Sequence, residues 1–373
     1  MKKARRVAPG QEGRLTLRDV AAELGVSAKT VSNAYARPDQ LSPGLRQQIL
    51  QTAARLGYPG PNPVAAALRR GRVGAVGVAY DNRLSYAFDD PTTSALLAGI
   101  TIVVEDAGAG LLLLPGSTDH RRRIAAATQA VVDGVIASSV ADDDPLLQLI
   151  IARRLPLVVI DQPRPNRLAA LGAASAPWIG IDDRAGTEAA AEHLLQLGHR
   201  TFGVVSFGLA RGLPAGFADR RTQAAATYAV TRDRLGGYRA AVERYGIDWA
   251  GIPVWGATDS TADEGEAGAH ALLARTPRPT ALLCLSDRLA EGAVRAAAGI
   301  GLRVPDDLSL VGFDDAAPLA AAHDLTTVRQ PNRSKGEHAA RALLDLLAGR
   351  QPPQRRLLPA HLSIRSSTRP AVP

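Results

Sequence analysis

The spacing of apolar side chains changes along the chain and divides it near residue 73. In residues 16–57 apolar positions recur every three or four residues, as at Val20, Ala21 and Leu24, which is the spacing of a helix face. Beyond residue 73, apolar runs of five to seven residues alternate with helical stretches. This pattern predicts a small all-helical domain followed by a larger body of helices and buried strands.

Three short helices are predicted in the first domain. A serine or threonine that can cap a helix precedes each one, and a glycine ends the first and the third. The first two helices and the glycine between them form a helix-turn-helix pattern, although a simple corner between two core helices gives the same pattern. The caps are Thr16, Ser27 and Ser42, and the glycines are Gly25 and Gly57.

A linker follows the helical domain, because the segment YPGPNPVAAALRRG contains three prolines that cannot lie inside a helix. Within it, Asn62 and Pro63 form a helix-start signal, and residues 64–69 could make fewer than two turns of helix. A helix this short is marginal by itself. We therefore expect it to form only when something packs against it.

The apolar runs of the body predict strands, and the segments between them predict helices. Continuous apolar strands that alternate with helices are typical of parallel sheets covered on both faces, either one large sheet or two smaller ones. The predicted helices include 185–197, 233–245, 262–275 and 287–299. The predicted strands are 74–80, 110–116, 133–139, 156–161, 178–182, 201–207, 253–257, 280–286 and 308–314.

The charge of the chain is concentrated at its N-terminal end. Residues 1–72 carry 13 Lys and Arg against 4 Asp and Glu, whereas the rest carries 31 against 32, for a net charge of +8. A basic end on a neutral body indicates a polyanionic partner. A disordered basic tail is the alternative reading, but residues 1–14 supply only +4 of the +9 excess.

Several protein classes are disfavoured by what the sequence lacks. There is no GxGxxG after a strand, P-loop, GxSxG elbow or HExxH motif, so we expect no enzyme, no metal and no cofactor. The single cysteine, Cys284, lies in an apolar run and cannot form an internal disulfide. The apolar stretch 96–114 is interrupted by Glu105 and Asp106, and no secretory signal is present. We expect a cytoplasmic protein without membrane contacts.

Longer motifs together resemble the lac repressor family of bacterial transcription regulators. The family's DNA-binding headpiece is similar to LTLRDVAAELGVSAKTVSNAY and LSPGLRQQILQTAARLGYPGPNP. Signatures of the family's body are similar to AEHLLQLGHR, LSDRLAEGAVRA, VPDDLSLVGFDD and LTTVRQP. The resemblance extends from about Leu15 to Arg365.

The resemblance implies a fold and a domain organisation. An all-α helix-turn-helix headpiece with a basic tail is expected in residues 1–60, a hinge helix in 61–72, and a periplasmic-binding-protein-like (type I) α/β core in 73–373. That core is expected to consist of two Rossmann-like subdomains joined by three crossovers, and the protein to form a homodimer. The implied N-subdomain is about 73–181 and 314–329, and the C-subdomain is about 182–313 and 330–373.

The resemblance also places the second helix in the major groove of DNA, where its first residues read bases. Ala28 and Lys29 take the two main specificity positions, and Lys29 can donate to guanine while the Ala28 methyl meets a thymine methyl. Asn33 takes a third position, where the family often has arginine; it suits adenine, or it is too short to reach a base. The other implied DNA contacts, most of them at positions that hold phosphates, are Thr16, Leu17, Ser27, Thr30, Ser32 and Ser42.

The hinge helix has its own implied DNA contacts. Leu68 matches the leucine that wedges into the minor groove, and Asn62 and Ala65 lie beside it in the sequence. Ala66 stands where the family commonly has arginine. Because the hinge forms only when it is packed, anything that separates the two hinges of a dimer is expected to release DNA.

Effector-binding residues are carried over from the family in the same way. Arg234 matches the arginine that grips effectors, and an arginine surrounded by aspartates and aromatic side chains suits a polyhydroxylated ligand. The alternatives are helix capping for Asp161 and Asp287, and a surface ion pair of Arg234 with Asp233 or Glu188. The implied effector residues are Tyr86, Phe88, Asp161, Trp178, Phe207, Arg234, Asp287 and Asp314.

The implied function is a ligand-responsive, sequence-specific regulator that binds a palindromic double-stranded DNA operator. We expect a repressor of a carbohydrate uptake or catabolism operon that is released by a small sugar-like effector. The alternative is a repressor that needs a co-repressor, or an activator, with a nucleoside-like or purine-like effector. Residues 208–232 form a longer connection than usual and are expected to be either a lid over the cleft or a mobile loop.

Overall fold

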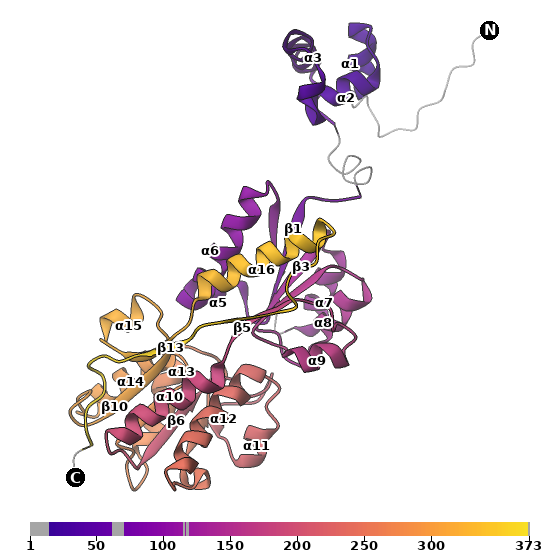
Figure 1. Ribbon diagram of the computed structural model, residues 1–373. Coiled ribbons are helices and arrows are strands. Elements are labelled where there is room, and N and C mark those ends of the chain that lie inside the picture. The colour runs from indigo at the N-terminus through magenta and orange to yellow at the C-terminus, as the bar shows by residue number, and fades with distance from the viewer. Residues whose placement is uncertain (1–14, 62–70, 115, 117–118, 372–373) are drawn as a thin grey trace. The chain divides into compact units, whose positions relative to one another are not determined.

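A computed structural model of the chain describes residues 15–61, 71–114, 116 and 119–371. The chain divides into two compact units at Val73 and Gly74 (Figure 1). Within the described part, no helix is long and apolar enough to cross a membrane. The predicted basic tail lies outside the described residues, as do the predicted hinge residues Asn62, Ala65 and Leu68.

The first unit contains the three predicted helices, and each begins after its predicted cap. The Ser27 hydroxyl accepts a hydrogen bond from the Thr30 N–H at 3.0 Å, and Gly25 ends the first helix with a φ of +63°, which glycine adopts without strain. The apolar faces meet in one small core of Val20, Val31, Ala34, Ile49 and Ala53. The helices are α1 (Leu17–Leu24), α2 (Ala28–Ala36) and α3 (Pro43–Leu56), with a 3-10 turn at Pro38–Gln40.

The second unit contains two sheets, so the alternative of one large sheet is wrong. The first sheet is entirely parallel, in the order β12-β5-β4-β3-β1-β2. Its strands are β1 (Ala75–Tyr80), β2 (Gly110–Leu114), β3 (Gly134–Ser138), β4 (Leu157–Ile160), β5 (Trp178–Ile181) and β12 (Arg355–Leu358). The helices of this part are α5 (Leu84–Asp89), α6 (Pro91–Asp106), α7 (His120–Gln129), α8 (Pro145–Ala152), α9 (Pro165–Ala170) and α16 (Asn332–Leu347).

The second sheet has the order β13-β11-β10-β9-β6-β8-β7, in which β13 and β7 are antiparallel to their neighbours. Its strands are β6 (Phe202–Ser206), β7 (Gly216–Phe217), β8 (Val254–Gly256), β9 (Ala281–Cys284), β10 (Ser309–Asp314), β11 (Thr326–Arg329) and β13 (His361–Ser363). Its helices are α10 (Asp183–Gln196), α11 (Arg220–Ala224), α12 (Ala229–Arg244), α13 (Ala262–Leu273), α14 (Asp287–Gly299) and α15 (Leu319–Ala322), and a 3-10 turn lies at Trp249–Gly251.

The expected division of the core into subdomains is wrong in its last third. Residues 314–329 belong to the second sheet, because β11 pairs with β10 in parallel, with Val311 opposite Thr326. Helix α16 belongs to the first sheet instead, since its Ala339 and Leu343 share a core with strands β1, β3, β4 and β5. The chain crosses between the sheets after β5, after β11 and after β12.

Helices α6 and α16 pack side by side on the first sheet (Figure 1). Glycine allows this close approach: a Cβ atom on Gly99 would collide with the carbonyl of Arg333, and one on Gly336 would collide with the carbonyl of Leu96. This packing fixes the segment between β11 and α16, which carries polar residues into the cleft described below.

Candidate functional site

The surface of α2 presents small polar side chains and one cation. Val31 and Ala34 are buried in the headpiece core, so the opposite side of the helix faces outward. Lys29 is exposed there, and among the described residues no carboxylate pairs with it. Asn33 is half-buried, and its Nδ2 donates a hydrogen bond to the Gln40 side chain at 3.2 Å. Lys29 is therefore available to a partner, whereas Asn33 would have to exchange an internal bond.

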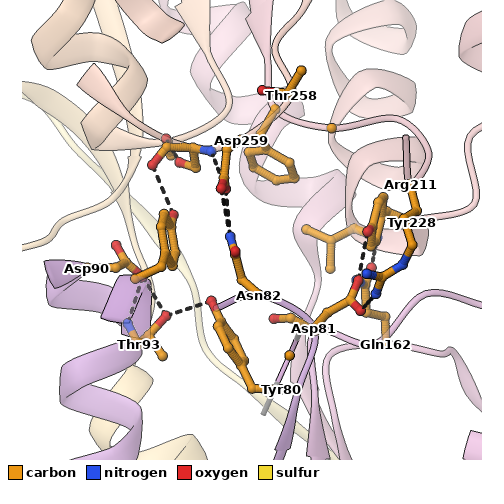
Figure 2. A pocket seen from close by; sticks show the side chains of 18 of the residues that line it. Tyr80, Asp81, Asn82, Asp90, Thr93, Gln162, Arg211, Tyr228, Thr258 and Asp259 are labelled. Atoms are coloured by element: carbon orange, nitrogen blue, oxygen red, sulfur yellow. Dashed lines mark hydrogen bonds and ion pairs between the residues drawn. The ribbon is translucent and has the colours of Figure 1, made fainter. Parts of the chain in front are cut away.

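A cavity of about 540 Å³ lies between the two subdomains of the second unit (Figure 2). Its lining comes mainly from segments that follow the carboxyl ends of β1, β4, β6, β8, β9 and β10. Open parallel sheets bind their ligands at this edge, which makes the cavity the candidate ligand site. The polar and aromatic lining includes Asp81, Asn82, Tyr86, Asp90, Asp161, Phe207, Asp259, Ser260 and Asp314.

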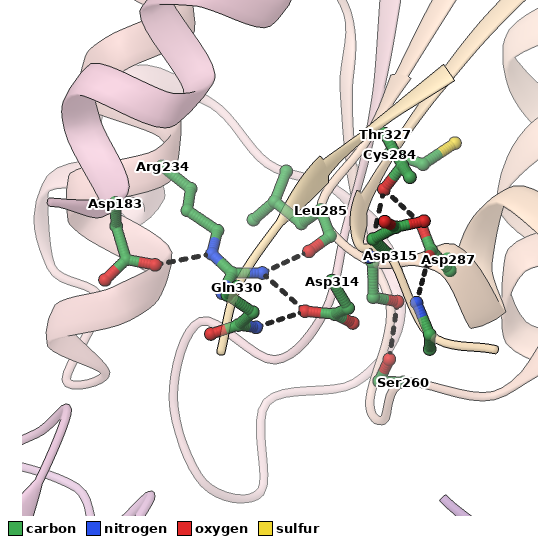
Figure 3. Close-up of polar contacts among 12 residues, drawn as sticks. Asp183, Arg234, Ser260, Cys284, Leu285, Asp287, Asp314, Asp315, Thr327 and Gln330 are labelled. Atoms are coloured by element: carbon green, nitrogen blue, oxygen red, sulfur yellow. Dashed lines mark hydrogen bonds and ion pairs between the residues drawn. The ribbon is translucent and has the colours of Figure 1, made fainter. Parts of the chain in front are cut away.

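Arg234 of α12 reaches this cavity from the second subdomain (Figure 3). Its Nε donates to Asp183 Oδ1 at 2.9 Å, and its Nη1 donates to the Leu285 carbonyl at 2.5 Å. The guanidinium also lies 3.5 Å from the ring centroid of Phe313. These contacts hold the arginine in one orientation, which is what a group that grips a ligand needs.

Asp314 faces Arg234 in the cavity, with Oδ1 3.7 Å from Nη1. Burial raises the pKa of Asp314 to about 7, although Arg234 opposes the rise. Asp314 also accepts from Gln330 at 2.5 Å, and Gln330 accepts from Lys335 at 2.5 Å. Lys335 donates to both carboxylate oxygens of Asp161 at 2.8 and 2.9 Å. This chain of polar contacts connects Asp161 of the first subdomain to Asp314 of the second.

Direct hydrogen bonds join the two subdomains beside the cavity. Asn82 Nδ2 donates to both carboxylate oxygens of Asp259 at 2.8 Å (Figure 2). The Tyr86 hydroxyl donates to the Ser260 carbonyl at 2.9 Å. Asn82 and Tyr86 follow β1 in the first subdomain, and their partners follow β8 in the second. These bonds hold the cleft closed on this side.

The inserted segment, residues 208–232, joins the subdomains at another place. Arg211 forms an ion pair with Asp81, and Arg232 Nη2 donates to Asp142 Oδ2 at 2.6 Å. The beginning of the segment, including Arg211, lines the cavity. Of the two expectations for this segment, the geometry favours the lid.

Similarity to known proteins identifies the family. Residues 191–368 match the family model described as a periplasmic binding protein-like domain. An HTH-type transcriptional regulator of Mycobacterium tuberculosis is 40% identical over 340 residues, covering 91% of this chain and 92% of that protein. The crystal structure of a LacI family transcriptional regulator from Corynebacterium glutamicum is 36% identical, with a TM-score of 0.72, and covers 95% of this chain and 98% of that chain. This chain belongs to the lac repressor family of transcription regulators.

A third similar structure is a complex of the transcriptional regulator CelR with cellobiose. It is 27% identical, has a TM-score of 0.67, and covers 95% of this chain and 100% of that chain. The sequence-based prediction of a lac repressor family regulator with a headpiece and a periplasmic-binding-protein-like core is therefore confirmed. The expectation that the chain is not an enzyme agrees with these relatives, which are named as regulators.

Five of the eight effector residues implied by the lac repressor family resemblance line one cavity. The surface alternative for Arg234 is wrong, because Arg234 is buried and its Nε donates to Asp183 and not to Asp233 or Glu188. The five are Tyr86, Asp161, Phe207, Arg234 and Asp314.

The other three implied effector residues do not line the cavity. Phe88 is 66% exposed to solvent, and Trp178 is buried, with its indole N–H donating to the carbonyl of Asp161 at 3.0 Å. Asp287 is buried behind the cavity, where it accepts from the Thr327 hydroxyl at 2.6 Å and the Ala316 N–H at 2.7 Å. Burial raises the pKa of Asp287 well above its ordinary value. Asp287 therefore fixes the turn after β10 and does not face a ligand.

Sequence reasoning missed several lining residues that follow strands. A signal was available for some of them, since Asp81 and Asn82 directly follow the apolar run of β1, and Ser286 closely follows that of β9. Asp259 and Ser260 follow the short strand β8 in the same way. No sequence signal marks Gln330 as a cavity residue, because its position at the cavity depends on where the chain crosses from β11 to α16.

Proposed function

We propose that this chain is a repressor of a carbohydrate uptake or catabolism operon, released from its operator by a small sugar-like effector. The observation that carries the proposal is the cavity, which is lined by a fixed arginine, several carboxylates and four aromatic residues. Carboxylates accept from sugar hydroxyls, and Tyr86 and Phe207 supply apolar ring faces. The similar CelR structure, which contains cellobiose, supports the same ligand class.

The surface of α2 supports the DNA-binding half of the proposal. Lys29 and Ala28 lie in the first turn of the helix, and Lys29 is exposed and available to guanine. Thr16 and Ser42, at the starts of α1 and α3, are exposed and could hold phosphates that fix the register. We propose these roles for them, together with Leu17, Ser27, Thr30 and Ser32.

We further propose that the protein acts as a homodimer through the edge of its first sheet. Strand β2 pairs only with β1 in that sheet, and its Leu112 is 39% exposed. Ile102 of α6, which packs on β2, is also exposed. An open strand edge beside exposed apolar side chains favours association with a second copy.

The first experiment is a selection of genomic DNA fragments with the purified full-length chain. A two-fold symmetric site with half-sites about one helical turn apart is the expected result. Enrichment of sequences without symmetry, or no enrichment with or without candidate sugars, would contradict the proposal. Genes beside the selected site would show whether the operon serves carbohydrate metabolism.

Replacement of Arg234 tests the effector half. Arg234→Ala should leave operator binding intact but weaken effector binding about 100-fold, because a buried charged hydrogen-bond donor to the ligand is lost. The measurement is operator release as a function of effector concentration, with Arg234→Gln as a second variant that preserves the side-chain volume better. Arg239→Ala, on an exposed face of the same helix, is the control. If effector releases both Arg234 variants from the operator as it releases the wild type, Arg234 does not bind the effector.

A further inference from the structure

The charges that line the cleft are unbalanced. Five aspartates line the cavity, two of which pair with cations outside the lining (Asp161 with Lys335 and Asp81 with Arg123), against two lining arginines, Arg211 and Arg234. Both arginines already pair with carboxylates, since Arg211 pairs with Asp81 and Arg234 pairs with Asp183. Neither cation is therefore free to neutralise an anionic ligand. The five aspartates are Asp81, Asp90, Asp161, Asp259 and Asp314.

Asp90 is a buried carboxylate that has only neutral hydrogen-bond donors. It caps α6, where its Oδ2 accepts from the N–H of Thr93 at 2.9 Å and from the hydroxyl of Thr93 at 2.5 Å (Figure 2). The residue is 7% exposed, and no described basic side chain bonds to it. The positive charge of Arg288, which lies over the ring of Tyr86 at 5.1 Å from its centroid, favours the ionised form of Asp90. Burial outweighs Arg288 and raises the pKa of Asp90.

Asp90 and Asp314 approach the cavity from opposite subdomains. Asp90 begins α6 in the first subdomain, and Asp314 ends β10 in the second. Both carboxylates line the cavity, and the negative charge of Asp90 tends to raise the pKa of Asp314, which is the direction that repulsion between two carboxylates gives. A ligand that donates hydrogen bonds or carries a positive charge relieves this repulsion, whereas an anionic ligand adds to it.

We propose that the cleft selects an uncharged or cationic polyhydroxylated ligand and rejects its phosphorylated and carboxylated counterparts, with Asp90 as a residue that determines this specificity. The proposal rests on the proposed function, in which this cavity binds the effector. It divides sugar-like ligands by charge: free sugars, polyols and amino sugars fit the cleft, and sugar phosphates and sugar acids do not.

The test uses the full-length chain and a panel of neutral pentoses, hexoses and disaccharides. Each sugar is accompanied by its amino derivative, its phosphate ester and its acid, and binding is measured by the shift in Tm and then by calorimetry. We expect at least one neutral or amino compound to raise Tm, and its phosphate ester to bind at least tenfold more weakly. A phosphate ester or sugar acid that binds more tightly than its neutral parent overturns the proposal, as does a panel in which no neutral or amino compound binds.

Replacement of Asp90 tests its role directly. Asp90→Asn keeps a good helix cap but removes the negative charge. It should therefore reduce, severalfold, the ratio of the affinity for the neutral ligand to the affinity for its phosphate ester. Asp219→Asn is a matched control, because Asp219 caps α11 with the same pair of bonds from Thr222 but does not line the cavity. If this ratio of affinities is the same in Asp90→Asn as in the wild type, Asp90 does not determine the specificity. Operator binding is measured without ligand in the same preparations, so that failure of the regulator function is recognised separately.

Discussion

Three residues with unusual backbone conformations line the cleft. Ser139, Asp161 and Asp314 follow or end strands, and their φ angles are +56°, +60° and +123°. Side chains other than glycine rarely adopt this region, and it persists only where the surrounding structure imposes it. In this chain the surrounding structure aims two of the carboxylates at the cavity. The strain at these positions is thus part of how the candidate site is built.

Asp314 makes the stability of the protein depend on pH in a definite direction. Its folded pKa of about 7 lies above the ordinary value of 3.8, so its contribution to stability is present below pH 3.8 and is lost as the pH rises to about 7. Asp314→Asn cannot ionise, so its Tm relative to the wild type should be higher at pH 8 than at pH 4.5. Thermal unfolding across this range measures the difference.

The neighbouring Asp315 is expected to make stability depend on pH in the opposite direction. Burial tends to raise its pKa, but hydrogen bonds from Arg329 and Arg365 lower it below the ordinary value. Asp315→Asn should therefore destabilise the protein at pH 8, and the loss should diminish as the pH falls below about 4. Parallel pH profiles for Asp314→Asn and Asp315→Asn would contradict both assignments.

Lys29 is the residue of α2 whose proposed role in DNA reading can be separated from its contribution to general affinity. Lys29→Ala should cost about 1–3 kcal/mol at the operator and relax the preference at one base position. The measurement is the affinity for a set of operators with single base changes at a fixed salt concentration. Equal weakening on every sequence would mean that Lys29 contacts a phosphate instead.

At the scale of elements, strand β2 differs from the four inner strands of the first sheet. The strands β1, β3, β4 and β5 pair on both sides, and most of their side chains are buried, whereas β2 pairs on one side and keeps Leu112 exposed. The neighbouring strand β1 is buried along most of its length. The exposure of β2 therefore follows from its place at the edge and not from its composition, since four of its five residues are leucine.

Introducing a charged side chain on the β2 edge tests whether the dimer forms there. Leu112→Lys should convert the protein to monomers and weaken operator binding roughly 100-fold, because two linked headpieces bind two half-sites far better than separate ones. Sedimentation or light scattering gives the mass, and titration of operator DNA gives the affinity. Tyr245→Lys, at an exposed apolar position after α12, is the control that should leave both unchanged. If the Leu112→Lys protein remains dimeric, the dimer interface does not include the edge at β2.

At the scale of the whole effector-binding unit, polar bonds between the subdomains set how far the cleft closes. Arg232 and Asp142 form one such bond outside the cavity lining. The bond between Asn82 and Asp259 closes the cleft at its lining. If the closed form binds effector, then the apparent affinity depends on the fraction of molecules that are closed.

Removal of the Arg232 bond tests this dependence without touching the ligand. Arg232→Gln should weaken effector binding about threefold to tenfold, because the closed form becomes less populated. Calorimetry with the effector measures the change. Arg239→Gln breaks an ion pair with Glu243 within the same helix and should have no effect. Equal affinity in the two variants would show that closure does not limit binding.

The sequence by itself determined the three headpiece helices, nine of the strands and the family, whereas β7, β11, β12 and β13 were not predicted. The caps at Ser27 and Ser42 and the apolar runs of β1 and β9 act within a few residues of themselves, so local patterns specify them. The concentration of basic residues in the first fifth of the chain and the headpiece motif indicate a DNA-binding regulator, because charge and local pattern do not depend on how distant segments pack.

Only the tertiary structure decided which elements share a sheet and which side chains share the cleft. Residues 314–329 and helix α16 exchange the subdomains expected for them, because strand pairing and helix packing over long separations in sequence determine that choice. The same crossover brings Gln330 to Asp314, and closure of the cleft brings Asn82 to Asp259. Asp90 and Asp314 lie 224 positions apart in the sequence, and only the fold places both at one cavity.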